Sequence, residues 1–260
     1  MAETSPILSE LQGHIGVVTL NRPDKFNCIS RALADGLSAA VRSLEANTQC
    51  RVVLLNANGN HFCTGADLDE VLAARETRAT LEAFIVSGHE ALSALEHSRL
   101  PIVGVVHGLC LAGGLELMMA CDVVIAAHSA RFGDQHAQYG LIPGWGGTQR
   151  LPRLVGLRRA LHLMYSAEWL DAVTAREWGL VSVVVDESAL GERAMAYAQT
   201  LATRNPQAIA SMKSLGSRGL DVPLSEGLAH ECECVVDALR SENVSEGLAA
   251  FQARRAPKFS

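Results

Sequence analysis

Glu116 is the residue with the clearest capacity for chemistry in this sequence, because it places a carboxylate inside the apolar run GGLELMMA. An unpaired carboxylate is costly to bury. Glu116 therefore either faces solvent on an amphipathic helix or is buried for a purpose. A buried carboxyl group with a raised pKa is a standard general acid or base. We therefore treat Glu116 as a candidate for proton transfer.

Two glycine-containing loops suggest a second kind of chemistry. They cover residues 61–68 (HFCTGADL) and 111–117 (LAGGLEL), and each follows an expected strand. Glycines just ahead of a helix leave backbone N–H groups free, pointing away from the helix. Two such loops in one sheet could direct two N–H groups at one oxygen, which is the arrangement of an oxyanion hole. The alternative is that these glycines only make tight turns.

Alternating strand and helix signals predict an α/β domain that would position these loops, with at least some parallel strand pairing. Apolar periodicity predicts strands at 15–20, 52–55, 101–106 and 123–127, and helices at 31–44 and 80–95. From about residue 155 the predicted segments are mostly helical, with one short strand at 181–185. We place a boundary near 200, which gives a core at 1–200 and a helical region at 201–260.

Composition narrows the class of protein. The chain has 260 residues, 48% of them hydrophobic and 19% charged, with a formal net charge of −6. A disordered chain would have fewer hydrophobic residues and more charged ones. The same values also argue against a nucleic-acid partner, which would need a basic surface. No apolar run approaches the length of a membrane span, so we expect no membrane insertion.

The N-terminus and the cysteines predict a cytoplasmic protein. The opening MAETSPILSE has neither the basic nor the apolar region of a signal peptide. The seven cysteines are odd in number and lie mostly in apolar runs, as expected of buried thiols in a reducing compartment. Cys232 and Cys234 follow His230, but their spacing on a helix points them to different faces. No second Cys/His pair has zinc spacing, so we expect no metal site.

Three long segments of the chain resemble the enoyl-CoA hydratase/isomerase (crotonase) family, whereas a G-x-x-x-x-G-K-[ST] loop and a G-x-S-x-G elbow are missing. The segments are HFCTGADL, GLCLAGGLELMMACD and ARFGDQHAQYGLIPGWGGTQRLPR, within a match that runs in order from Leu20 to Phe259. The resemblance implies a spiral of ββα units and a C-terminal region for trimerisation, as a homotrimer or a dimer of trimers. It also implies an acyl-CoA thioester substrate and no separate cofactor.

The resemblance further implies roles for individual residues. Backbone N–H groups of Ala66 and Gly113 would hold the thioester oxygen and stabilise an enolate. Glu116 matches the first of two glutamates that position water and move protons in the family's hydratases. The residues expected to contact the substrate are Asp67 and Leu68 at the coenzyme A entrance, Gly114 in the second loop, Leu141 and Trp145 at the acyl pocket, and Arg254 near the coenzyme A phosphate.

Arg254 has an alternative role, and Trp145 has a consequence for the acyl chain. Arg254 would reach its phosphate across a subunit boundary, and a solvated surface charge is the alternative. Trp145 adds bulk to a glycine-rich loop, which favours a short or specifically shaped acyl chain.

His136 is the main departure from the family pattern. The second glutamate is expected in an FG-x-x-E pattern, but here the residues after Phe132-Gly133 are Asp134, Gln135 and His136. His136 could replace the glutamate as an acid or base, since its ordinary pKa is near ~6.5. It could instead select a polar acyl group, or be a hydrogen-bonded histidine in a site whose chemistry is lost or changed.

The function predicted from these residues is the reversible addition of water to a 2-enoyl-CoA, with Glu116 and His136 as the catalytic pair. The alternatives are another chemistry of the same family (isomerisation, dehalogenation, decarboxylation or hydrolysis) or a catalytically silent acyl-CoA-binding protein. Retention of Glu116 favours an enzyme. Loss of the second glutamate counts against a dedicated double-bond isomerase.

Overall fold

A six-stranded sheet forms the centre of the structure, a computed structural model that describes residues 5–260. The strands lie in the order β1-β2-β3-β4-β6-β9, and all neighbours are parallel except β1 and β2. Their bounds are Ile7–Gln12 (β1), Ile15–Leu20 (β2), Val52–Ala57 (β3), Ile102–Val106 (β4), Val123–Ala127 (β6) and Val183–Val185 (β9). Val and Ile dominate the inner strands, as expected of a parallel sheet covered on both faces.

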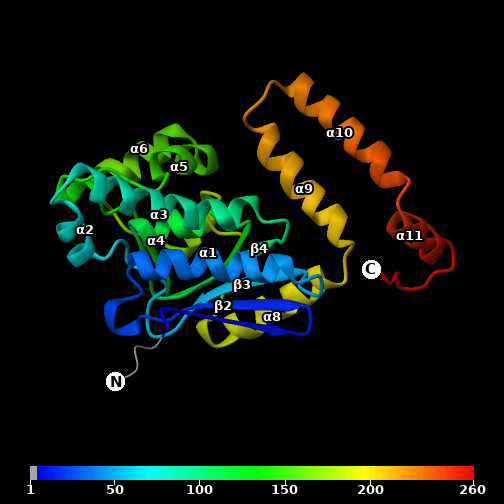
Figure 1. The fold of residues 1–260 in the computed structure, drawn as a ribbon, viewed down its shortest axis with the longest axis horizontal. Helices are drawn as coiled ribbons and strands as arrows, with labels where there is room; N and C mark the ends of the chain where they lie inside the picture. The colour runs from blue at the N-terminus through cyan, green and yellow to red at the C-terminus, as the bar shows by residue number, and fades with distance from the viewer. Residues whose placement is uncertain (1–4) are drawn as a thin grey trace.

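Alternate residues of each inner strand face two different helical layers. In β3, Val53 and Leu55 pack into the core with α1 and α3, whereas Val52 and Leu54 pack with α8. Figure 1 shows α1 and α3 on one side of this sheet and α8 on the other. The helices span Arg31–Ala46 (α1), Arg78–His97 (α3) and Leu190–Ala202 (α8).

A second, three-stranded sheet adjoins the two glycine-containing loops. It consists of β5 (Leu109–Leu111), β7 (Arg131–Gly133) and β8 (Leu170–Asp171), and β5 is followed directly by α4 (Gly113–Met119). The parallel bridge between Cys63 and Cys110 joins the loop after β3 to this sheet. The chain thus passes from main sheet to small sheet to helix, which confirms the predicted α/β spiral.

The region after β7 is built mainly from short helices. The helical part of the chain begins earlier than the sequence predicts, at Gly147 rather than near 155, because the glycine-rich GWGG segment makes the turn that starts α5. The remaining elements of this core are η1 (Pro23–Lys25), α2 (Leu68–Ala74), η2 (Ala137–Tyr139), α5 (Gly147–Val155), α6 (Leu157–Ser166), α7 (Ala172–Glu177) and η3 (Glu187–Ala189).

The last three helices extend away from the core. α9 (Pro206–Gly219) and α10 (Leu224–Leu239) lie side by side, and α11 (Glu242–Gln252) follows at the far end of the molecule (Figure 1). Lys213 ties α9 to the core, since its Nζ donates to the carbonyls of Leu95 and Leu100 and lies 2.8 Å from Asp122 Oδ2. None of the helices within residues 5–260 is long and apolar enough to cross a bilayer.

Candidate active site

The backbone of the first glycine loop leaves the N–H of Ala66 without an acceptor. Ala66 forms a parallel bridge with Ile29, in which Ile29 N donates to Gly65 O and Asp67 N donates to Ile29 O. A parallel bridge of this kind uses the peptide groups on either side of Ala66, so that the N–H of Ala66 itself points away from Ile29. Within residues 5–260 the Ala66 N–H donates no backbone hydrogen bond.

The second loop brings the first backbone nitrogen of α4 close to Ala66. Gly113 is the first residue of α4, so its N–H has no partner within the helix. It follows Ala112, whose φ of 49° is strained for a residue with a side chain. A Cβ built on Gly113 would lie 3.4 Å from the Ala66 nitrogen. The two predicted oxyanion donors therefore border one small space.

Gly114 allows the two loops to approach this closely. A Cβ at this position would collide with the carbonyl oxygen of Cys63, a backbone atom that cannot swing aside. Substrate contact at Gly114 stays a prediction, but this glycine has a structural role. It brings α4 against the first loop and so sets the separation of the Ala66 and Gly113 nitrogens.

Glu116 is fully buried on α4, and backbone N–H groups solvate its carboxylate. Its Oε1 accepts hydrogen bonds from Trp145 N at 2.8 Å and from Gly147 N at 2.7 Å. Burial raises the pKa of the Glu116 carboxyl, and the opposing effects of the Gly147 N–H and the nearby His136 do not cancel it. Oε2 accepts no hydrogen bond from the described residues, so it is left to face the site.

His136 lies opposite Glu116, with 3.9 Å between His136 Nε2 and Glu116 Oε2. Its Nδ1 lies 2.8 Å from Oδ1 of the buried Asp134, which also accepts the His136 backbone N–H. The Asp134 carboxylate therefore holds the proton on Nδ1 and turns Nε2 toward Glu116. Burial by itself lowers the pKa of His136, but the Asp134 hydrogen bond and the charges of Asp134 and Glu116 outweigh it and raise that pKa.

Arg150 and Glu96 hold the loop that binds Glu116, and the sequence alone did not single them out. Arg150 forms a two-pronged ion pair with Glu96 on α3, with Nη2 at 2.6 Å from Oε2, and also donates to the Trp145 carbonyl. Gly146, at a φ of 97°, has no side chain to obstruct the Arg150 guanidinium. Only the fold reveals this contact, because Glu96 and Arg150 lie 54 positions apart.

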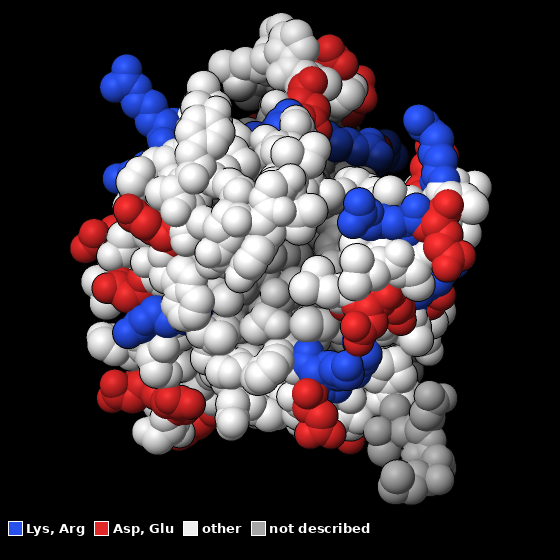
Figure 2. Space-filling model, turned by 90° about the vertical axis from the view of Figure 1, so that its left-hand side faces the viewer, with Lys and Arg blue, Asp and Glu red and all other residues white. Residues whose placement is uncertain are grey.

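Asp67 and Leu68 begin α2 beside the first loop. The Asp67 carboxylate accepts from Arg22 Nη2 at 2.7 Å and from the N–H of Asp69, which caps α2. Burial alone would raise the pKa of Asp67. The hydrogen bond and the charge of Arg22 lower it by more, so the pKa of Asp67 lies below its usual value. Leu68 is 63% exposed. Figure 2 views the end of the molecule that carries α2, where the centre of the face is uncharged and charged side chains lie around its rim.

The other predicted contact residues are Trp145, Leu141 and Arg254, and the structure does not bring all three to the site. Trp145 is buried, and its ring packs beside Gly113. Leu141 is half-exposed after η2. Arg254 lies two residues beyond the end of α11. Figure 1 shows α11 far from α2 and α4, so within one chain this part of the structure is not at the site.

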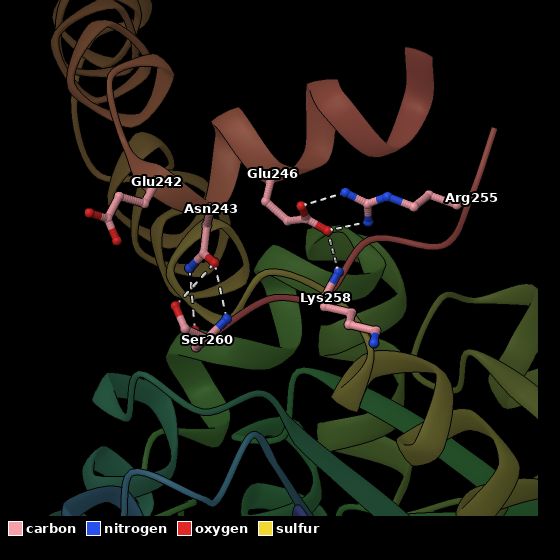
Figure 3. A pocket seen from close by; sticks show the side chains of 6 residues that line it. All are labelled: Glu242, Asn243, Glu246, Arg255, Lys258 and Ser260. Carbon is pink, nitrogen blue, oxygen red and sulfur yellow. Dashed lines mark hydrogen bonds and ion pairs between the residues drawn. The ribbon is translucent and has the colours of Figure 1, made fainter. Parts of the chain in front are cut away.

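A hollow near Arg254 has a different character from the site around Glu116. Figure 3 shows its lining side chains, among which Arg255 pairs with Glu246 and Ser260 bonds to Asn243. These contacts fold the C-terminal tail back onto α11. The hollow contains neither the predicted oxyanion donors nor the catalytic pair.

Comparison with known proteins identifies the family. A model of the enoyl-CoA hydratase/isomerase family matches residues 10–260. A Rhizobium meliloti protein named "Probable enoyl-CoA hydratase" is 35% identical over 97% of each chain, and mouse mitochondrial methylglutaconyl-CoA hydratase is 34% identical over 97% of this chain and 81% of its own. The crystal structure of an enoyl-CoA hydratase from Bacillus anthracis has a TM-score of 0.93 at 34% identity, covering 98% of each chain. The chain belongs to the enoyl-CoA hydratase/isomerase family.

Substitution of Gly114 by Ala tests whether the close approach of the two loops creates the predicted oxyanion hole. The added Cβ collides with Cys63 O and moves α4 away, so we expect the affinity for butyryl-CoA, a saturated thioester, to fall about tenfold, the value of roughly one hydrogen bond. Isothermal titration calorimetry measures this. Gly191→Ala is the matched control, because a Cβ there meets nothing within 4 Å. Unchanged affinity in a folded Gly114→Ala protein would contradict the assignment.

Proposed function

We propose that this protein catalyses the reversible addition of water to the double bond of a 2-enoyl-CoA thioester. The observation that carries the proposal is the buried pair of Glu116 Oε2 and His136 Nε2, 3.9 Å apart, in a site where two loops supply free backbone N–H groups. A water molecule can be within hydrogen-bond distance of both atoms, since such bonds are ~2.8 Å long. The substrate carbons then lie between this pair and the oxyanion donors.

The first step activates the thioester and the water together. The thioester oxygen accepts hydrogen bonds from Ala66 N–H and Gly113 N–H, which draws electron density from the double bond toward that oxygen. The Glu116 carboxylate takes a proton from water as the hydroxyl oxygen bonds to the β-carbon. The product of this step is an enolate whose negative charge rests in the oxyanion hole.

The second step places a proton on the α-carbon. The His136 imidazolium donates its Nε2 proton, and Asp134 stabilises the charged ring before the transfer and orients it throughout. Glu116 then carries the proton that came from water, and His136 is neutral. Transfer of that proton from Glu116 to His136 across their 3.9 Å separation restores the starting state. The reverse sequence removes water from a 3-hydroxyacyl-CoA.

Replacement of Glu116 by Gln tests the general base. The Gln carbonyl oxygen can still accept the N–H groups of Trp145 and Gly147, so the loop should keep its position while the base is lost. We expect kcat for crotonyl-CoA to fall about a thousandfold, with unchanged affinity for butyryl-CoA. The loss of enone-thioester absorbance measures turnover. Glu82→Gln, on the exposed face of α3, is the control. A Glu116→Gln enzyme that keeps normal turnover would exclude this role.

The pH dependence of kcat tests the general acid. Hydration needs an ionised Glu116 and a protonated His136, so kcat should fall below the first pKa and above the second. Both pKa values are raised, from ordinary values of 4.5 and 6.5, so both limbs of the profile should lie above those values. Asp134→Asn removes a carboxylate that raises the pKa of His136, so the alkaline limb should move to lower pH.

His136→Ala should remove the alkaline limb and lower kcat about a hundredfold without weakening butyryl-CoA binding. Asp221→Asn, which changes an exposed carboxylate, is the control for the Asp134 variant. If Asp134→Asn left the alkaline limb in place, or if His136→Ala left turnover intact, the assignment of His136 as the acid would be wrong.

We also infer that the helical region at 201–260 joins chains into a homotrimer or a dimer of trimers. In one chain α9 and α10 bury no residue completely, and together with α11 they expose large apolar side chains that would cost free energy in water. These are Met212, Leu220, Leu224, Leu228, Val235, Val236, Leu239, Leu248 and Phe251. In such an assembly Arg254 of one chain would reach the coenzyme A phosphate bound to a neighbour.

Sedimentation equilibrium tests the assembly. We expect a mass of three or six times the 27.7 kDa chain. Leu228→Asp combined with Leu239→Asp should shift the protein toward smaller species, because burying these charges opposes association. Leu8→Asp changes an exposed leucine on the edge strand β1 and should leave the mass unchanged. A monomeric native protein would refute the proposed assembly.

A further inference from the structure

The Trp145 side chain fills the space between two helices, and a glycine on each helix makes room for it. Trp145 is 3% exposed. A Cβ built on Gly88 of α3 would collide with the indole Nε1. On the other side, a Cβ built on Gly113 of α4 would lie 2.6 Å from Cζ3. The indole therefore occupies a slot that exists because both of these positions lack a side chain.

The same ring forms a wall of the site around the oxyanion donors. The Cβ position on Gly113 that meets Cζ3 also lies 3.4 Å from the Ala66 nitrogen. The six-membered ring of Trp145 and the Ala66 nitrogen thus border one small space. The backbone N–H of Trp145 holds Glu116 at the adjoining edge of that space. Substrate atoms that lie between the oxyanion donors and Glu116 therefore meet the indole on the side of α3.

Fit rather than hydrogen bonding sets the position of the indole. Its buried Nε1–H has no acceptor among the described residues. Its nearest aromatic neighbour is Phe84 on α3, with ring centroids 5.7 Å apart and planes tilted by 46°. The ring is thus held by apolar contacts with α3 and α4. Such a side chain affects a ligand by occupying space and not by hydrogen bonding.

We propose that Trp145 and Gly88 together restrict the acyl group to a short chain, by filling the slot into which a longer chain would extend beyond the reacting carbons. The inference rests on the proposed binding of an acyl-CoA thioester at Ala66 and Gly113. Gly88 has a defined part in it. A side chain at position 88 would displace the indole. Residue 88 on α3 and residue 145 on the loop therefore compete for the same space.

Binding of saturated thioesters tests this inference independently of catalysis. Calorimetry compares butyryl-CoA with decanoyl-CoA on the native protein and on Trp145→Ala. The native protein should bind butyryl-CoA at least as tightly as decanoyl-CoA. Trp145→Ala should gain about tenfold in affinity for decanoyl-CoA relative to butyryl-CoA, because the vacated slot buries additional methylene groups. The ratio of kcat/KM for 2-decenoyl-CoA and crotonyl-CoA should change in the same direction.

Two further variants separate volume from other effects. Trp145→Phe removes the N–H but keeps an aromatic ring, so it should retain most of the preference for the short chain. Trp145→Ala combined with Gly88→Leu refills the slot from α3 and should restore that preference. The inference is overturned if the native protein binds decanoyl-CoA more tightly than butyryl-CoA, or if folded Trp145→Ala leaves their ratio unchanged. Absence of hydration with the expected binding ratios would reject the proposed reaction alone.

Discussion

The burial of one carboxylate governs the geometry of this site. Glu116 lies inside the core on α4, and its Oε1 is solvated by the N–H groups of Trp145 and Gly147. Without these two bonds the buried group would be destabilising. The same bonds fix the GWGG turn, and through it the start of α5. The carboxylate therefore organises the loop that positions it, while Oε2 stays free to face His136.

Close backbone approaches provide the second half of the site. Gly114 lets α4 rest against the Cys63 carbonyl, and the strained Ala112 makes the turn that leads from β5 into α4. Both features lower the stability of the isolated loops. The parallel sheet and its two helical layers supply the packing that offsets this cost. The packed core thus fixes the positions of the Ala66 and Gly113 backbone N–H groups, as the proposed stabilisation of a developing charge requires.

Local patterns in the sequence predict much of this fold, since the strands and helices of the main sheet follow from apolar periodicity. The proximity of Glu116 and His136 was expected from the family pattern, and the structure brings them together. The ion pair of Arg150 with Glu96 and the division of space between Trp145 and Gly88 could not be predicted, because each joins residues more than 50 positions apart. Nor does the sequence reveal that Gly147 begins a helix, since a glycine-rich run is compatible with an open loop.

The central claim is that the Glu116–His136 pair and the oxyanion donors add water across a double bond through an enolate. The most direct test is the reaction of crotonyl-CoA with the native protein in D₂O, followed by NMR of the product. The account predicts 3-hydroxybutyryl-CoA carrying one deuterium at the α-carbon. In Glu116→Gln both the hydration and the deuterium incorporation should be lost together. Recovery of unchanged crotonyl-CoA from a protein that binds it at this site would contradict the account.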